Sequence, residues 1–186
     1  KLNIDKYKNV LSEVESILQE NHFKKNVNIG TKEIKEKYLN SIDSQKIVFD
    51  KEDFDNFSNA EDLNKLNQIK FAFEIFEIFK KKSIKFLELQ RQVITEIDLE
   101  SQLDTNDFIF KDREDEKRFK NLEELSEYHL KEAKSELISI YLKEKDLKKS
   151  KEKLLKRFVN REKSLNRISE DDIFSMYVNS FTSFYD

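Results

Sequence analysis

The fold is decided by the stretch FAFEIFEIFKKKSIKFLELQ, residues 71–90. A half-buried strand would alternate apolar and polar side chains, and the pairs Ile75-Phe76 and Ile78-Phe79 break that alternation. On a helix, at about 100° per residue, the polar side chains gather into one narrow stripe and apolar side chains cover most of the remaining circumference. The stripe consists of Lys70, Glu74, Glu77, Lys81, Lys85, Glu88 and Gln92. The stretch therefore predicts a helix with neighbours on several sides, the central element of a bundle.

The composition favours the same fold class. The 186 residues include one Gly and no Pro, whereas tight β-hairpins need residues that tolerate positive φ. The sixteen Phe residues can fill a core, which distinguishes the chain from a disordered polyampholyte. No stretch reaches the roughly 18 uncharged apolar residues that a membrane-spanning helix needs. We predict an all-α fold, a single domain over residues 1–186 that forms a bundle of five to seven helices around the central Phe-rich helix.

Other helices are predicted from apolar side chains at three- and four-residue spacing. A first helix has its apolar stripe over residues 4–18 and is expected to stop within residues 21–28, and a second begins at a cap formed by Thr31. A break is expected within residues 143–149, and a basic helix follows it. The last helix is aromatic, and Ser169 with Asp172 gives its N-terminus the spacing of a capping box.

Two segments lose the helical period and are expected to be loops, residues 47–58 and residues 100–112. Ser58 and Glu61 have capping-box spacing, which predicts the start of the central helix at this point. Asp112 is expected to cap the next helix along the chain.

The sequence carries none of the common catalytic or metal-binding signatures. One Gly leaves no phosphate-binding loop, dinucleotide-binding fingerprint or nucleophile elbow. Without Cys, and with His22 and His129 far apart, the chain has no Cys–His nucleophile pair and no zinc motif, and both His are expected at the surface. Residues 50–61 fail the calcium-loop template because Phe54 stands at a ligand position and Asp55 where Gly is needed. We predict no catalytic residue, no cofactor and no metal; an enzyme with an unrecognised carboxylate site is the rival interpretation.

Charge is unevenly distributed along the chain. Residues 143–167 carry eleven Lys or Arg against four Asp or Glu, a net charge of +7, whereas the whole chain carries −3. Such a segment can steer an acidic partner, or it can be a solvated bundle face, which is the commoner case. Nucleic acid is disfavoured by the overall acidity and by the lack of a reader motif. The residues selected as candidate partner contacts are Lys148, Lys149, Lys156, Arg157 and Arg161.

The aromatic last helix is a second candidate surface. By default its rings close the core. A terminal amphipathic helix is also the element most easily exchanged or docked between two copies of a chain. The candidate self-association residues are Phe174, Tyr177, Phe181 and Tyr185, and we predict a monomer or a weak homodimer.

Several segments, in this order, resemble a known family. The segments are SEVESILQE (12–20), KEIKEKYL (32–39), IVFDKEDFD (47–55) and KLNQIKFAFEIFEIFKKKS (65–83), followed by the aromatic C-terminal helix. This layout resembles the all-helical outer surface lipoproteins of Borrelia, the Lyme disease spirochaetes, and among them the paralogous family containing complement regulator-acquiring surface protein A. The local stretch EIFEIFKKKS, residues 74–83, is the most telling match.

The resemblance implies a lipoprotein ectodomain on the bacterial cell surface, held to the outer membrane by a lipidated Cys upstream of Lys1. It implies a non-enzymatic protein that binds host or tick proteins. Complement factor H, which the founding member binds, is one candidate partner and complement evasion one candidate role, although paralogs of this fold often do not share that ligand. No binding residue carries over, because no local motif matches the family closely enough. A cytoplasmic helical scaffold or a nucleic-acid-binding protein is the alternative, and a Met directly before Lys1 would favour it.

Overall fold

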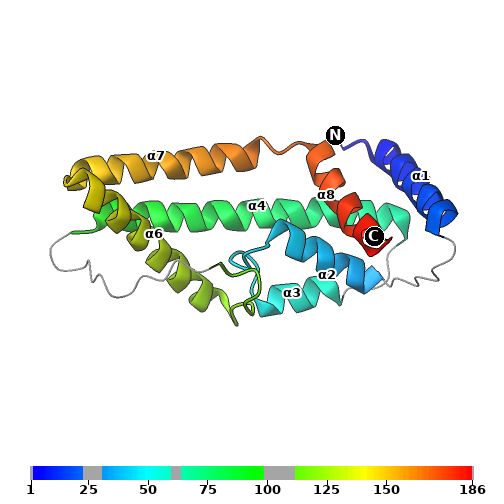
Figure 1. Cartoon of the computed structure of the whole chain (residues 1–186), viewed down its shortest axis with the longest axis horizontal. Helices are drawn as coiled ribbons and strands as arrows, with labels where there is room; N and C mark the ends of the chain where they lie inside the picture. The colour runs from blue at the N-terminus through cyan, green and yellow to red at the C-terminus, as the bar shows by residue number, and fades with distance from the viewer. Residues whose placement is uncertain (1, 23–30, 60–63, 99–111, 186) are drawn as a thin grey trace. The chain divides into compact units, whose positions relative to one another are not determined.

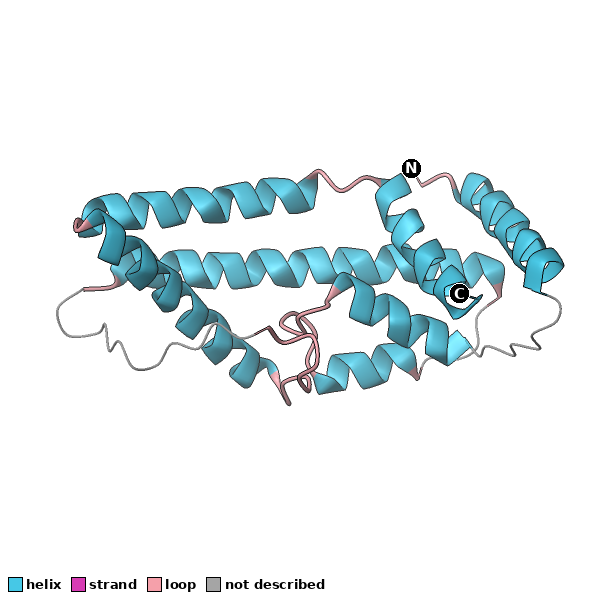
Figure 2. Ribbon diagram, viewed as in Figure 1, coloured by secondary structure: helices cyan, strands magenta, loops and turns pink. Residues whose placement is uncertain are grey.

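A computed structural model describes residues 2–22, 31–59, 64–98 and 112–185. All regular structure in these ranges is helical, and none of it is a strand (Figures 1 and 2). The elements are α1 (Ile4–His22), α2 (Thr31–Ile42), α3 (Lys51–Ser58), α4 (Lys65–Glu96), α6 (Leu122–Glu144), α7 (Leu147–Asn166), α8 (Glu170–Thr182) and the 3-10 helix η1 (Ser183–Tyr185). The prediction of an all-α bundle is confirmed, with seven α-helices in the described residues.

The central helix is confirmed as α4, which contains the whole of residues 71–90. All seven members of the predicted polar stripe are exposed. Ile69, Ala72 and Phe76 lie on other sides of the helix and are buried. A Phe-rich sequence therefore forms a helix that can pack on several sides while one charged stripe keeps contact with water.

Two helix boundaries follow the predicted chemistry. The break within residues 143–149 is confirmed at Lys145, which ends α6 with a left-handed φ of 57° and donates its N–H to the Tyr141 carbonyl at 2.8 Å. Asp146 then begins α7 by accepting a hydrogen bond from the N–H of Lys149 at 3.0 Å. The capping box of Ser169 and Asp172 is confirmed at the start of α8.

The loop prediction for residues 47–58 is wrong from Lys51 onward, where residues 51–58 form α3. Eight residues make about two turns, too few for a helical period to show. Ser58 ends this helix instead of starting the next one, because its hydroxyl donates to the Phe54 carbonyl at 2.6 Å. The central helix is capped by Asn64, whose side chain accepts from the N–H of Asn67 at 2.9 Å.

The cap prediction for Asp112 is also wrong. Asn121 caps α6 by accepting from the N–H of Glu124 at 3.0 Å. The Asp112 carboxylate accepts from the Glu114 N–H and the Gln45 side chain, each at 3.0 Å, and these bonds lower its pKa. It therefore organises a turn ten residues before α6 begins. The predicted loop over residues 100–111 lies outside the described residues.

The chain divides into two compact units. Unit 1 is made of Lys1–Ser44, Lys51–Phe79 and Ile168–Asp186, and unit 2 of Gln45–Asp50 and Lys80–Arg167. The first part of α4 thus belongs to unit 1 and its remainder to unit 2. Whether the chain is one domain stays a prediction.

Unit 1 has a core of aromatic rings. The Tyr7 ring lies 5.2 Å from that of Phe73 and 4.7 Å from that of Phe174, and Tyr38 meets Tyr177 edge-on at 5.4 Å. A buried tyrosine needs a partner for its hydroxyl. Tyr38 donates to the Ala72 carbonyl and Tyr177 to the Gln68 side chain, both at 2.6 Å. These contacts place α1, α2 and α8 on the first part of α4.

Unit 2 has a mainly aliphatic core between α6, α7 and the second part of α4. Its buried members are Leu87, Ile94, Ile97, Ala133, Leu137, Ile140, Leu154 and Phe158. Figure 1 shows α6 and α7, in olive and orange, joined by the short turn at residues 145–146.

Residues 45–50 form a segment of unit 2 that is held by α6 and the turns before it. The ring of His129 places Nε2 2.7 Å from the Ile47 carbonyl and stacks on Phe86 at 4.1 Å. The Arg118 guanidinium donates to the Phe49 carbonyl at 3.1 Å. His129 is only 7% exposed, so the prediction of a surface His is wrong here. The side chain of His22 lies outside the described residues.

Candidate binding site on helix α7

The five predicted partner contacts all lie on α7 and are all exposed. They are Lys148, Lys149, Lys156, Arg157 and Arg161. Ser150, Leu154 and Phe158 of the same helix are buried in unit 2, on the side opposite Lys149 and Lys156. An apolar stripe at three- and four-residue spacing thus sets the rotation of α7 and leaves its cationic side chains facing solvent.

Not all of the cations on α7 are available to a partner. The Arg161 guanidinium forms an ion pair with Glu136 of α6 at 2.5 Å. Lys151 donates to the Ile97 carbonyl at 2.6 Å, and Lys153 pairs with Glu144. Arg161 is therefore the one predicted contact whose charge is already matched by a carboxylate of its own unit.

The remaining predicted contacts form no ion pair with any residue that the structure describes, and a fifth cation joins them. Lys163 is exposed in the same way and was not predicted. Lys149, Lys156 and Lys163 recur every seven residues, about two helical turns, so they share one line along the helix. This spacing could have been read from the sequence. We call these three residues the lysine row.

The surface beside the lysine row is chemically mixed. Glu152 is exposed, and the Val159 side chain is 39% exposed. By helical position both residues fall next to the row. Ammonium groups with an adjacent carboxylate and an apolar side chain can bind a partner through charge and through nonpolar contact.

The predicted self-association residues have a different setting. Phe174, Tyr177 and Phe181 are buried in unit 1, while Tyr185 is half-buried with its ring 5.7 Å from that of Phe181. These rings close the core of unit 1, which was the default interpretation of the aromatic helix.

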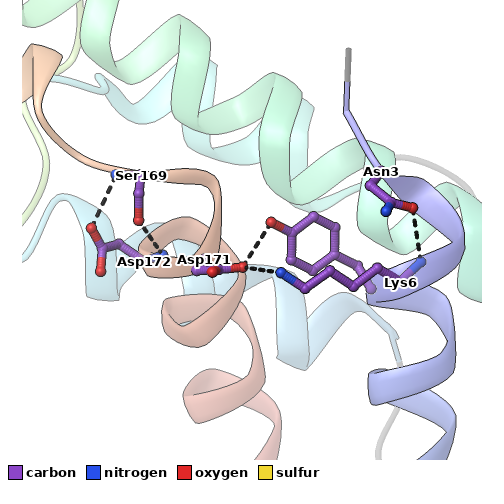
Figure 3. Close-up of polar contacts among 6 residues, drawn as sticks. Asn3, Lys6, Ser169, Asp171 and Asp172 are labelled. Carbon is purple, nitrogen blue, oxygen red and sulfur yellow. Dashed lines mark hydrogen bonds and ion pairs between the residues drawn. The ribbon is translucent and has the colours of Figure 1, made fainter.

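The start of α8 is tied to α1 by a small polar cluster (Figure 3). The Asp171 carboxylate accepts hydrogen bonds from the Lys6 ammonium and the Tyr7 hydroxyl, both at 2.9 Å. These bonds lower the pKa of Asp171. Burial and the bond to Asp171 raise the pKa of Tyr7 to about 12. The hydroxyl therefore stays protonated at neutral pH and acts as a donor, so the cluster fastens α1 to α8.

A second charged cluster lies on α6 and α7 of unit 2. Burial and the neighbouring Glu136 raise the pKa of Glu132, and Arg161 opposes that shift.

In the described parts of the chain, no group of three or more His, Cys, Asp or Glu side chains could hold a metal ion. None of the described helices is long and apolar enough to cross a membrane.

Comparison with known proteins places the chain in a family. No curated protein matches it significantly. The family described as Tail specific protease N-terminal domain matches residues 14–186, from the middle of α1 to the end of the chain. The matched region includes the aromatic core of unit 1 from Tyr38 onward, all of unit 2, and the lysine row. The chain therefore belongs to the family of tail-specific protease N-terminal domains.

Proposed function

We propose that the chain is a non-catalytic helical domain of a tail-specific protease, and that it helps to bind the proteins on which the protease acts. The observation that carries this proposal is the family match over residues 14–186. The family's description names a protease directed at protein tails and assigns this region to its N-terminal domain. On this proposal the residues that cut peptide bonds lie outside the chain.

The fold suits such a supporting role. The cores of both units are built from packed helices, and the cationic side chains of α7 point to solvent from a rigid helix. Groups presented on a helix keep their spacing better than groups on a loop. A binding surface of this kind can hold a protein substrate while the chemistry occurs elsewhere.

A proteolysis assay tests the proposal by comparing the full-length protein with the isolated chain. The substrate is a folded protein with an unstructured C-terminal tail, and its matched control lacks the tail. We expect the full-length protein to degrade the tailed substrate and spare the control, and the isolated chain to cleave neither. Cleavage by the isolated chain would refute a non-catalytic role, and a full-length protein inactive on every tailed substrate would refute the protease assignment.

A surface lipoprotein that binds host or tick proteins is the second candidate, and it rests on the resemblance of residues 74–83 and of the order of segments. The family match does not bear on it, and it stays a prediction. Mass spectrometry of the protein from its own cells provides the test. A lipidated Cys upstream of Lys1, together with capture of a serum or tick protein, would support it, and an unlipidated protease would exclude it.

A further inference from the structure

We propose that the lysine row of α7 binds acidic segments of protein substrates. This inference rests on the proposed function and adds to it the chemical class of the substrate. The row comprises Lys149, Lys156 and Lys163, all exposed. None of the three forms an ion pair with a residue that the structure describes.

The row has a regular geometry. At about 1.5 Å of rise per residue, its members stand about 10.5 Å apart along the helix. A peptide in the polyproline II conformation rises about 3.1 Å per residue with three residues per turn, so every third side chain returns to the same face after about 9.3 Å, nearly the same interval. An acidic segment can therefore place several carboxylates opposite the row at once, which a single lysine could not achieve.

The positive charge of the row is also not paired with a carboxylate of any residue that the structure describes. Two other charged groups of α7 are matched inside unit 2, since Arg161 pairs with Glu136 and Glu162 pairs with Arg91 at 3.2 Å, whereas Lys148 and Arg157 resemble the row in forming no ion pair with a described residue. The lysine row therefore contributes an unmatched positive field on a chain whose net charge is −3. Such a field raises the rate at which an acidic partner associates.

The neighbours of the row favour a polypeptide over other polyanions. The exposed Val159 offers a nonpolar contact, which apolar side chains of a polypeptide can use and a phosphate backbone, bound through its charge, cannot. An anionic membrane binds amphipathic helices through their apolar side. In α7 that side is buried in unit 2 around Leu154 and Phe158.

The test uses the full-length protein carrying Lys149→Glu, Lys156→Glu and Lys163→Glu. Two substrates share one C-terminal tail, and one carries a Glu-rich segment where the other carries a Ser-rich segment. At low salt we expect the triple variant to lose about tenfold in kcat/KM on the acidic substrate, mainly through KM, and to keep its rate on the neutral one. Added salt should remove the difference between wild type and variant, because screening shortens the range of the field.

A matched control reverses three exposed lysines of α4, Lys70, Lys81 and Lys85, and thus changes the net charge by the same amount. We expect this control to retain the wild-type preference. An equal loss in both triple variants, or no loss in either, would overturn the inference. Circular dichroism establishes that each variant keeps its helical content.

Direct binding separates this inference from the proposed function. Fluorescence anisotropy with a labelled Glu/Ser peptide measures capture by the row without any cleavage. If the wild type binds this peptide and the lysine-row variant does not, the inference holds even for a protein that cleaves no tailed substrate. Tight binding of single-stranded DNA or of phosphatidylglycerol vesicles, lost in the variant while the peptide remains bound, would assign the row to another partner and overturn the inference.

Discussion

Unit 1 and unit 2 fill their cores with different side chains. Unit 1 uses rings, two of which, Tyr38 and Tyr177, carry hydroxyls that are hydrogen-bonded inside the core. Unit 2 uses mostly Leu and Ile, and its polar contacts lie around this core, as between Arg161 and Glu136. Rings have preferred contact geometries and buried hydroxyls need one partner each, so unit 1 depends on the placement of individual side chains. An aliphatic core depends more on total volume.

The largest expected effect tests whether α4 supports unit 1. Phe76 is 2% exposed. Phe76→Ala should lower the free energy of unfolding by about 3–5 kcal/mol, because the substitution leaves a cavity that the neighbouring rings cannot fill. Chemical unfolding followed by circular dichroism measures the change. A loss below about 1 kcal/mol would mean that this helix is not central to the unit.

Leu137→Ala gives the matched test in unit 2, where Leu137 is fully buried. A cost of about 2–5 kcal/mol is expected for this truncation. Hydrogen exchange assigns each loss to a unit: Phe76→Ala should open amides of α2 and α8, and Leu137→Ala amides of α6 and α7. If both variants open the same amides, the two units unfold as one body.

The next largest effect is expected in the 45–50 segment of unit 2. His129→Ala removes both the stack on Phe86 and the hydrogen bond to the Ile47 carbonyl. The combined loss should be about 1–3 kcal/mol. His129→Phe keeps a ring against Phe86 and should recover part of that loss. Faster amide exchange in residues 45–50 of the Ala variant checks the assignment, and unchanged exchange there would contradict it.

A smaller effect tests the role of hydroxyls in the ring core. Tyr38→Phe removes one buried hydrogen bond, to the Ala72 carbonyl, and leaves the ring in place. We expect a loss of about 0.5–1.5 kcal/mol in the free energy of unfolding. If Tyr38→Phe leaves the free energy of unfolding unchanged, unit 1 relies on ring volume alone and does not differ from unit 2 in this respect.

The smallest effect is a pH dependence at the start of α8. The pKa of Asp171 is lowered in the folded state by hydrogen bonds from Lys6 and Tyr7. The ionised carboxylate therefore stabilises the fold above its unfolded pKa of about 3.9, and that stabilisation is lost as pH falls through the lower folded pKa. Asp171→Asn should be less stable than wild type at pH near 7, and the difference should vanish in acid. Urea unfolding across this range measures it, and Lys6→Gln should show the same trend.

The sequence predicted those features that local chemistry determines. The predicted polar stripe of α4 is confirmed, because its seven side chains lie on one side of the helix and are all exposed. The predicted break at Lys145 and the predicted capping box at Ser169 are confirmed as well. The helix α3 was missed because it is shorter than the window in which a period can be recognised. The cap of α6 was misplaced because both Asp112 and Asn121 have suitable side chains, and only tertiary contacts with Gln45 give Asp112 its other role.

Features that depend on distant residues were not accessible to this reasoning. Nothing near Ile47 in sequence indicates that its carbonyl meets His129, and nothing on α7 indicates that Arg161 pairs with Glu136. All five candidate contacts on α7 are exposed, and whether they contact a partner stays a prediction. The apolar stripe of α8 was recognised, but its pattern alone could not distinguish the core of its own unit from a second copy of the chain.

The interruption of unit 1 by unit 2 in the sequence has a consequence for biosynthesis. A ribosome releases the first part of α4, then all of Lys80–Arg167, and only afterwards α8. Until Phe174 and Tyr177 are synthesised, Tyr7 lacks its contact with Phe174 and Tyr38 lacks its contact with Tyr177. We therefore expect unit 2 to be complete on the nascent chain while the rings of unit 1 are still exposed to solvent and to chaperones. The last helix then completes the core of unit 1.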